Sequence, residues 1–545
     1  MAVVLIVLLL APGVRAGTAA IASPDRYGAD AAGEILATGG NAVDAAVATA
    51  FMLSVTYPDA GNLGGGGFAT VWFKGKAYFL DYRERAPAAA KPAMYLDARG
   101  EVVPDASTVG ARAAGVPGTV MGLWQLHRRF GSLPWARDLA PAIRQARDGF
   151  VVTKMLDERR AGAVKQLAGR TNFERYFGGA TAGVNWCQPE LAATLERIAA
   201  GGAREFYRGE TARRLVAQMK RDHGLITARD LGSYRAAWRA PLTARWSGYT
   251  VITAPPPSSG GIGLVGLLQM RADAAPSFTG VTLNSPQYIH LLAELEKRIF
   301  ADRAEYLGDP DYTHVPVARL TDPRYLASRA AAISPDRPSP TDSVRPGIDE
   351  HHHTTHFSIT DRWGNAVSNT YTLNDDFGNG EVVEGAGFLL NNEMDDFSAK
   401  PGAPNIYQVV GGNANAIAPG KRPLSSMSPT ILVRDGRVAL VIGTPGGSRI
   451  FTSVFQVISN WHDFHLSLGE SVAALRIHHQ LLPPDTLFEE PYRQVDEATR
   501  AALTARGYRF EAQDYNGDIQ VIAIDARGAE AVADPRGIGV GRLLE

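Results

Sequence analysis

The stretch HHHTTHFSITDRWGNAVSNTYTLN, residues 351–374, decides the fold. Polar and apolar residues alternate over 354–361 and again over 366–373, and a Trp363-Gly364-Asn365 turn separates the two runs. A period of two predicts a pair of antiparallel strands. Residues 335–353 are polar and rich in proline, which predicts an exposed, flexible linker before the first strand. The linker therefore delivers Thr354 to the start of a strand.

A second hairpin is predicted over 430–444, where TILVRDGRVALVIGT turns at Asp435-Gly436. It runs through Pro445-Gly446-Gly447 into a predicted helix over 448–461. Two more strands are predicted on either side of Lys74-Gly75, and another over 248–254. Hairpins and helices in both halves of the chain predict antiparallel sheets between layers of helices, an α+β fold.

Helical patterns occupy much of the remaining sequence. Residues 23–56 predict two helices, the first begun by Ser23-Pro24 and the second capped by Asn41. Residues 110–310 are mostly helical in pattern and end in a long amphipathic helix over 285–308. Between these regions, GNLGGGG (61–67) is too rich in glycine for regular structure.

The composition narrows the class of protein. Lys+Arg is 55 and Asp+Glu is 56 in 545 residues, so the chain lacks the basic character of a nucleic-acid binder. The first 16 residues are an apolar run that ends in Val14-Arg15-Ala16, which predicts a signal peptide, although no Lys or Arg precedes the run. The run is too short to span a membrane at about 20 residues per crossing. We therefore expect a periplasmic or secreted protein that is not embedded in a membrane.

The junction between His353 and Thr354 carries the first chemical signal. A threonine hydroxyl is a poor nucleophile unless a base lies beside it, and cleavage of the preceding peptide bond would supply its own α-amine. That amine titrates near pH ~8 and can act as a base at neutral pH. Two threonines at the start of a strand are also ordinary, because β-branched residues favour strands.

Other residues could complete a site, and each also has a plainer explanation. Gly446 and Gly447 precede a helix, where two N–H groups can stabilise an oxyanion or merely form a tight turn. Arg83 ends a strand and could clamp a carboxylate or pair with Glu84 or Asp81. Ser425 and Ser426 could donate to a carboxylate or shape a loop. The polar residues after the second strand would suit an ammonium group or form a surface loop; they are Thr372, Asn374, Glu393, Asp395 and Asp396.

Neither a metal site nor a cofactor is predicted. Residues 351–353 are three adjacent histidines, whose side chains diverge, whereas zinc ligands are spaced along a turn or helix. The glycine-rich stretch 61–67 lacks the G-K-[ST] ending of a phosphate loop.

Taken together, these segments resemble the γ-glutamyltranspeptidases (glutathione hydrolases), which are N-terminal nucleophile hydrolases. The resemblance runs from about residue 18 to the C-terminus. Its segments are GGNAVDAAVATAF (39–51), AGNLGGGGF (60–68), DYRERAP (81–87), GVPGTVMGL (115–123), APPPSSGGI (254–262), ADRAEYLGDPDY (301–312), TTHFSITD (354–361), TYTLN (370–374), LLNNEMDDFS (389–398), KRPLSSMSPTI (421–431) and GTPGGSRI (443–450).

The resemblance implies a four-layer αββα sandwich formed jointly by two subunits of one precursor. Autocatalytic cleavage between His353 and Thr354 would give a large subunit, 17–353, and a small catalytic subunit, 354–545. The heterodimer would act on glutathione or another γ-glutamyl donor, with water, an amino acid or a peptide as acceptor. A glutaryl or cephalosporin acylase of the same superfamily is the alternative, and a poly-γ-glutamate enzyme or a non-catalytic binding protein are weaker ones.

The resemblance also implies the role of each site residue. Thr354 would be the nucleophile, Thr372 its hydrogen-bonding partner, and Gly446 and Gly447 the oxyanion hole. The substrate α-carboxylate would be held by Arg83, Ser425 and Ser426, and its α-ammonium by Asn374, Glu393 and Asp396. Residues 401–412, with Tyr407, resemble a lid loop. His353 and Asn379 depart from the pattern of the family, and Glu393 occupies a position where family members carry either Glu or Gln.

Overall fold

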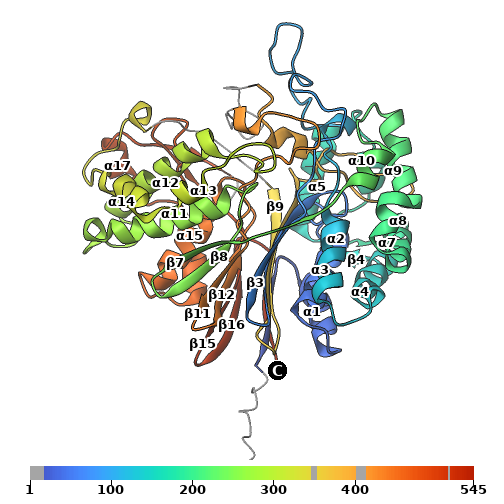
Figure 1. Ribbon diagram of the computed structural model, residues 1–545, viewed down its shortest axis with the longest axis horizontal. Helices are drawn as coiled ribbons and strands as arrows, with labels where there is room; N and C mark the ends of the chain where they lie inside the picture. The colour runs from blue at the N-terminus through green and yellow to red at the C-terminus, as the bar shows by residue number, and fades with distance from the viewer. Residues whose placement is uncertain (1–16, 345–352, 401–412, 514–515) are drawn as a thin grey trace, which may run out of the picture.

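Two antiparallel sheets lie face to face in the computed structural model, and a layer of helices covers the outer side of each (Figure 1). The structure describes residues 17–344, 353–400, 413–513 and 516–545. This arrangement confirms the predicted α+β fold and its four αββα layers. The predicted signal peptide and lid loop lie outside the described residues.

The first sheet has seven strands in the order β17-β1-β9-β10-β2-β3-β6. Strands β9 and β10 are the predicted hairpin, and β2 and β3 are the strands predicted around Lys74-Gly75. The bounds are β1 Ala19–Ser23, β2 Gly66–Phe73, β3 Lys76–Asp81, β6 Ala237–Arg239, β9 His353–Thr360, β10 Ala366–Asn374 and β17 Val540–Leu544. This sheet takes strands from both sides of the 353–354 bond, so a cut there would leave two pieces that share one sheet.

The second sheet has six strands in the order β16-β15-β12-β11-β8-β7. The predicted hairpin over 430–444 forms β11 and β12, and the strand predicted over 248–254 is β8. The bounds are β7 Leu242–Trp246, β8 Tyr249–Thr253, β11 Thr430–Arg434, β12 Arg437–Gly443, β15 Gln520–Asp525 and β16 Gly528–Ala533. Two short pairs lie outside both sheets, β4 Phe150–Val151 with β5 Asn185–Trp186, and β13 Thr486–Glu489 with β14 Arg509–Ala512.

Helices α1–α10 cover the first sheet and α11–α17 the second (Figure 1). The first layer comprises α1 Arg26–Ala37, α2 Ala42–Thr56, α3 Thr119–Phe130, α4 Trp135–Asp148, α5 Lys154–Leu167, α6 Phe173–Phe177, α7 Pro189–Gly201, α8 Ala203–Arg208, α9 Glu210–Arg221 and α10 Ala228–Ser233. The second comprises α11 Gly260–Asp273, α12 Pro286–Tyr306, α13 Val317–Leu320, α14 Pro323–Ala331, α15 Arg449–His462, α16 Leu468–Ala473 and α17 Glu497–Ala505. None of these described helices combines the length and the apolar character needed to cross a membrane.

Apolar side chains fill the three interfaces between the layers. One cluster joins α1–α10 to the first sheet, one joins α11–α17 to the second, and a smaller one lies between the sheets. Helix α2 is buried along its whole length, since its 15 residues run through the first of these clusters. A helix that is apolar on all sides belongs in a core rather than on a surface.

The first helix begins differently from the prediction. Ser23 ends strand β1, and the side chain of Asp25 caps α1 by accepting a hydrogen bond from the N–H of Gly28. The predicted cap at Asn41 is confirmed, because its side chain accepts from Val43 and Asp44 in a capping box. The loop predicted over 61–67 is also partly wrong, since its last two glycines begin β2.

The first part of the predicted linker packs against α12. The hydroxyl of Ser339 donates to Glu294 at 2.5 Å, and its carbonyl oxygen accepts from Lys297 at 3.0 Å. Val344 is buried. Residues 335–344 are thus partly exposed, as at Asp336 and Arg337, and partly packed against the protein, as at Ser339 and Val344, while 345–352 lie outside the described residues.

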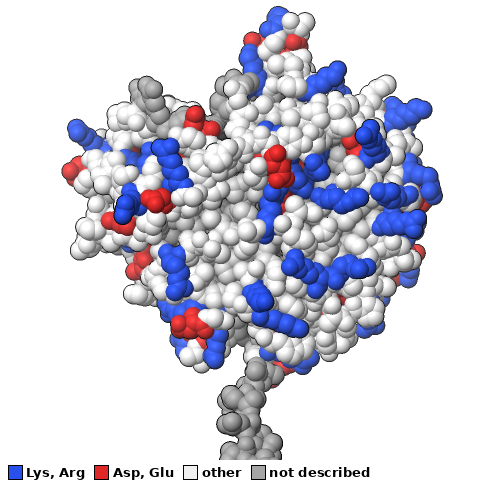
Figure 2. Space-filling model, viewed as in Figure 1, with Lys and Arg blue, Asp and Glu red and all other residues white. Residues whose placement is uncertain are grey.

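Charged side chains on the face in Figure 2 are dispersed, and Lys and Arg are frequent over the α1–α10 layer. Several arginines there form surface ion pairs, among them Arg213 with Glu210 and Arg221 with Glu384. Such exposed pairs balance charge locally and contribute little to stability.

Candidate active site

Thr354 lies near the start of β9, opposite Thr372 in the ladder with β10. Its hydroxyl donates a hydrogen bond to the Thr372 hydroxyl oxygen at 3.3 Å, and both residues are buried. The uncut chain places His353 in the same strand, opposite Asn374. In this state the Thr354 nitrogen is part of a peptide bond and cannot act as a base, so only a cut before it would create the α-amine.

The register of β9 and β10 shifts between Thr372 and Asn374. Asn374 has a φ of 84°, and its N–H donates to the Thr372 hydroxyl oxygen at 2.8 Å. Its side-chain amide donates to the carbonyl oxygen of Asn392 at 3.1 Å. The irregularity thus orients the Thr372 hydroxyl and links β10 to the acidic turn that follows Asn392.

Alternate residues of β9 face the second sheet and are polar. The His356 ring bonds to the hydroxyl of Thr370 at 2.8 Å, and the Ser358 hydroxyl donates to the carbonyl oxygen of Gln520 at 3.0 Å. Burial lowers the pKa of His356 to about 3, so the ring is neutral. A Cβ atom at Gly443 would lie 2.4 Å from this ring, so the end of β12 reaches β9 only because the residue is glycine.

Gly446 and Gly447 follow β12 and precede α15. Their φ values of +125° and +60° are readily adopted only by glycine. Their carbonyl oxygens accept from the N–H groups of Arg449 and Ile450 at 3.1 and 3.0 Å. Neither glycine N–H donates a hydrogen bond to another described residue. Two such donors at the start of a helix can stabilise a negatively charged oxygen.

Arg83 lies at the centre of a buried charge cluster. Its guanidinium group forms ion pairs with Glu393 and Asp396, and Glu84 lies 3.6 Å away. It also donates to the carbonyl oxygens of Pro423 and Leu424 at 3.3 and 3.1 Å. The local pairing with Glu84 or Asp81 considered above is therefore secondary, because the main ion pairs join residues more than 300 positions apart.

The acids in this cluster outnumber the cations that pair with them. Burial alone would lower the pKa of Arg83, but the charges of Glu393 and Asp396 outweigh it and raise that pKa. Burial raises the pKa of Glu84 to about 7 and that of Glu393 well above its ordinary value, although the charge of Arg83 opposes both shifts. A positively charged ligand would be favoured here, since it would balance the excess acid.

Ser425 and Ser426 lie in a buried loop next to residues 258–259. The Ser426 hydroxyl lies 3.2 Å from that of Ser259 and accepts from Arg303 at 3.3 Å. The Ser425 carbonyl oxygen accepts from the N–H of Ser259 at 2.7 Å. The loop also carries Pro423 and Leu424, so it brings the serines to the Arg83 cluster.

Asp395 and Asn379 form hydrogen bonds to segments next to the site. The Asp395 carboxylate accepts from the hydroxyl of Ser107 at 2.5 Å. Asn379 is fully buried, donates to the carbonyl oxygen of Gly110 at 3.1 Å and accepts from the N–H of Glu381 at 2.9 Å. The unusual residue at 379 thus holds the segment after β10 in place.

The glycine-rich stretch supports Thr372, a role that sequence reasoning missed. The Asn62 amide donates to the Thr372 carbonyl oxygen at 2.9 Å, and its oxygen accepts from Thr119 at 2.7 Å. A Cβ atom at Gly65 would lie 2.0 Å from the same carbonyl oxygen. The signal was present in the run of glycines, which marks a close approach of two backbones.

The chain is similar in sequence to proteins of known function. A family model described as gamma-glutamyltranspeptidase matches residues 28–543. The glutathione hydrolase proenzyme of Pseudomonas aeruginosa is 61% identical over 527 residues, which cover 96% of this chain and 94% of that protein. That of Escherichia coli K12 is 42% identical over 535 residues, which cover 96% and 91%.

Solved structures that resemble this chain include a γ-glutamyltranspeptidase and an acylase. The γ-glutamyltranspeptidase of Pseudomonas nitroreducens complexed with L-DON is 58% identical, with a TM-score of 0.59 over 60% of this chain and 97% of that chain. A cephalosporin acylase from Bacillus halodurans has a TM-score of 0.82 over 99% of both chains, but it is only 27% identical. Its fold matches, whereas its sequence is much more distant. The chain described here belongs to the γ-glutamyltranspeptidase family, whose members hydrolyse or transfer γ-glutamyl groups.

Proposed function

We propose that Thr354 is the nucleophile of this γ-glutamyl hydrolase and transferase, and that the chain creates it by cutting itself between His353 and Thr354. The observation that carries the proposal is the buried hydrogen bond from the Thr354 hydroxyl to Thr372 at the start of β9. The residues before the cut, 345–352, lie outside the described residues, so the proposal rests on the strand and its neighbours.

Self-cleavage requires one attack and one hydrolysis. The Thr354 hydroxyl oxygen attacks the carbonyl carbon of His353, the peptide C–N bond breaks, and an ester forms while the Thr354 nitrogen becomes an amine. Water then hydrolyses the ester, which leaves a carboxylate on His353 and restores the Thr354 hydroxyl. Thr372 accepts a hydrogen bond from this hydroxyl and so holds it in place before and after the cut.

In the processed enzyme, the α-amine of Thr354 takes the hydroxyl proton as the oxygen attacks the γ-carbonyl carbon of the donor. The negative charge moves to the carbonyl oxygen, where the N–H groups of Gly446 and Gly447 stabilise it. The amine returns its proton to the leaving nitrogen, and a γ-glutamyl ester remains on Thr354. Water, an amino acid or a peptide then resolves this ester.

The charge cluster around Arg83 suits a donor that carries both α charges. In the structure, Arg83 pairs with Glu393 and Asp396. A γ-glutamyl group can insert its α-carboxylate next to Arg83 and the serines at 425–426, and its α-ammonium next to Asn374 and the two acids. The exchange keeps each buried charge paired, whereas a ligand with only a carboxylate would leave the acids without a cation.

The large and small subunits, 17–353 and 354–545, would stay together as a heterodimer because they share the first sheet. The apolar run at 1–16 supports export to the periplasm or the medium. Glutathione is the donor we propose, on the basis of the glutathione hydrolases to which the chain is similar.

Replacing Thr372 with Val should slow both self-cleavage and turnover. Val has nearly the same shape but accepts no hydrogen bond, so the Thr354 hydroxyl and the N–H of Asn374 both lose their partner. We expect kcat to fall about 10–100-fold, the range for loss of one orienting hydrogen bond. Release of 4-nitroaniline from a γ-glutamyl anilide measures kcat, and Thr372→Ser should restore most of it. Unchanged rates in Thr372→Val would remove Thr372 from the mechanism.

The acylase alternative is separated from the proposal by Asp396→Asn. The wild-type enzyme should hydrolyse γ-glutamyl-4-nitroanilide at least about 100-fold faster than glutaryl-4-nitroanilide, which lacks the α-ammonium. Asp396→Asn should lower kcat/KM about 30–1,000-fold for the first substrate, since it removes a buried charge partner. It should lower it less than tenfold for the second. If the wild-type enzyme prefers the glutaryl substrate, the acylase hypothesis is correct.

A further inference from the structure

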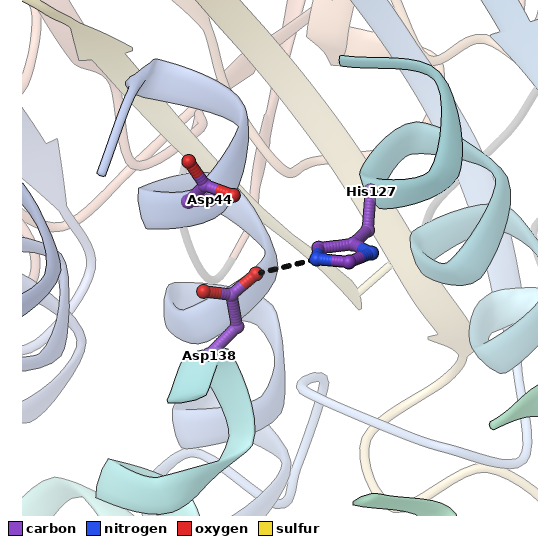
Figure 3. Close-up of side chains that lie close together, drawn as sticks. All are labelled: Asp44, His127 and Asp138. Atoms are coloured by element: carbon purple, nitrogen blue, oxygen red, sulfur yellow. Dashed lines mark ion pairs between the residues drawn. The ribbon is translucent and has the colours of Figure 1, made fainter. Parts of the chain in front are cut away.

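Three titratable side chains meet where α2, α3 and α4 come together (Figure 3). Asp44 and Asp138 lie in the first turns of α2 and α4, and His127 lies in the last turn of α3. Each offers one ligand atom, and these atoms lie within 4.8 Å of one another. The two aspartates are 0% exposed. The cluster is separate from the candidate active site and takes no part in the chemistry proposed there.

Asp138 is the observation that sets this cluster apart. Neither of its carboxylate oxygens has a hydrogen-bond partner among the described residues, although the side chain is fully buried. In Figure 3 the carboxylate points toward His127, whose Nε2 lies 3.8 Å from one of its oxygens. That separation is too long for a hydrogen bond. A buried, ionised carboxylate with no hydrogen bonds is strongly unfavourable unless a cation balances it or a proton neutralises it.

Asp44 is held in place by the backbone around it. Its carboxylate accepts from the N–H of Asn41 at 2.8 Å and from the N–H and hydroxyl of Ser132 at 2.9 and 2.5 Å. These bonds orient it, as outer partners orient the carboxylates of known metal sites. His127 Nε2 donates a hydrogen bond to the carbonyl oxygen of Leu133 at 2.8 Å, and a cation bound here would replace that proton and contact both atoms.

We propose that Asp44, His127 and Asp138 bind a divalent cation. Two carboxylates balance its charge, the imidazole supplies one nitrogen and the Leu133 carbonyl can supply a further oxygen. A donor set of one nitrogen and several oxygens suits a first-row ion such as Mn²⁺ or Zn²⁺. The alternative occupant is a proton, because burial and then the charge of Asp44 raise the pKa of Asp138 to about 9.

The position of the cluster assigns the cation a structural role. Helix α2 has 15 residues and is therefore about 22 Å long. Asp44 is at its beginning, whereas the segment after its end carries Asn62, which supports Thr372. A cation at the far end would join the starts of α2 and α4 to the end of α3. It should raise stability and leave turnover unchanged.

The test uses the processed enzyme after treatment with EDTA and removal of the chelator. Mn²⁺ is titrated in, and the electron paramagnetic resonance signal of the free ion is followed. We expect binding of one Mn²⁺ per chain and, with saturating Mn²⁺ or Zn²⁺, a rise of about 3 °C or more in the unfolding midpoint. The rate with a γ-glutamyl anilide should change less than about twofold.

Asp138→Asn should weaken Mn²⁺ binding about 100-fold and abolish the thermal shift. Asp148→Asn is the matched control, because Asp148 is exposed at the end of the same helix and should leave both unchanged. His127→Gln gives a second variant if Asp138→Asn fails to fold. An unchanged Mn²⁺ signal with the wild-type enzyme, or equal binding by the Asp138 and Asp148 variants, would overturn the proposal.

Discussion

The Thr354→Ala variant should remain one uncut polypeptide and should show no measurable γ-glutamyl hydrolysis. In the proposed scheme, the substitution removes the oxygen that would attack His353 and, with it, both self-cleavage and the nucleophile of the processed enzyme. Because both stages depend on one hydroxyl, we expect activity to fall by at least about 10⁴-fold. Intact-mass measurement should find one species, where the wild type gives two, and the lighter wild-type fragment should begin at Thr354 and contain 545 − 354 + 1 = 192 residues.

Thr354→Ser is the matched control, since it keeps a hydroxyl in the same place. It should still split into two fragments, more slowly, because serine lacks the methyl group that fixes the rotamer of threonine in a strand. Two fragments from Thr354→Ala, or an active wild-type enzyme in which residues 353 and 354 remain joined, would contradict the scheme. A fold control by circular dichroism distinguishes loss of chemistry from loss of structure.

The hairpin that carries Thr354 could be predicted because its two strands are adjacent in the sequence. Alternation over 354–361 and 366–373 specified the faces, and the turn at 363–365 set which residues oppose one another. Thr354 and Thr372 point to the same face and pair in the observed ladder. Local patterning therefore sufficed for this element and for the second hairpin.

The charge cluster could not be predicted in the same way. Arg83 and Asp396 are 313 positions apart, and no local pattern indicates that two such residues meet. The sequence resemblance implies that they bind opposite ends of a ligand, whereas the structure pairs them with each other. The two descriptions agree once the ligand is treated as a replacement for this ion pair.

The missed elements have local causes. Strand β1 is the short, alanine-rich segment AAIAS, whose residues have little strand propensity, and it is a strand because β17 and β9 flank it. Ser23 and Asp25 are both residue types that favour helix caps. Because Ser23 is part of strand β1, Asp25 caps the helix. In each case a tertiary contact overrides a weak local preference.

Arg83→Met should lower kcat/KM for γ-glutamyl substrates about 10³-fold or more. The variant removes the donor that would clamp the substrate carboxylate, and it leaves Glu84, Glu393 and Asp396 buried without their cation. Breaking one side of a buried charge network costs about 3–5 kcal/mol. The loss should therefore appear in the unfolding midpoint as well as in the kinetics. Arg83→Lys keeps the charge, so it should recover most of the stability but little of the activity, because lysine lacks the planar fork.

The pH dependence of stability separates this explanation from a simple packing defect. A buried acid whose pKa is raised on folding binds its proton more tightly in the folded protein than in the unfolded chain. The free energy of unfolding therefore falls as pH rises through the folded-state pKa of that acid. In the wild type the pKa of Glu84 is about 7, and the charge of Arg83 already lowers it from a higher value. Arg83→Met lacks that charge, so the pKa of Glu84 should be higher in the variant. The free energy of unfolding of the variant should therefore continue to fall above pH 7. Adding Glu84→Gln should reduce that loss, whereas a packing defect would give a midpoint that is lower by the same amount at every pH.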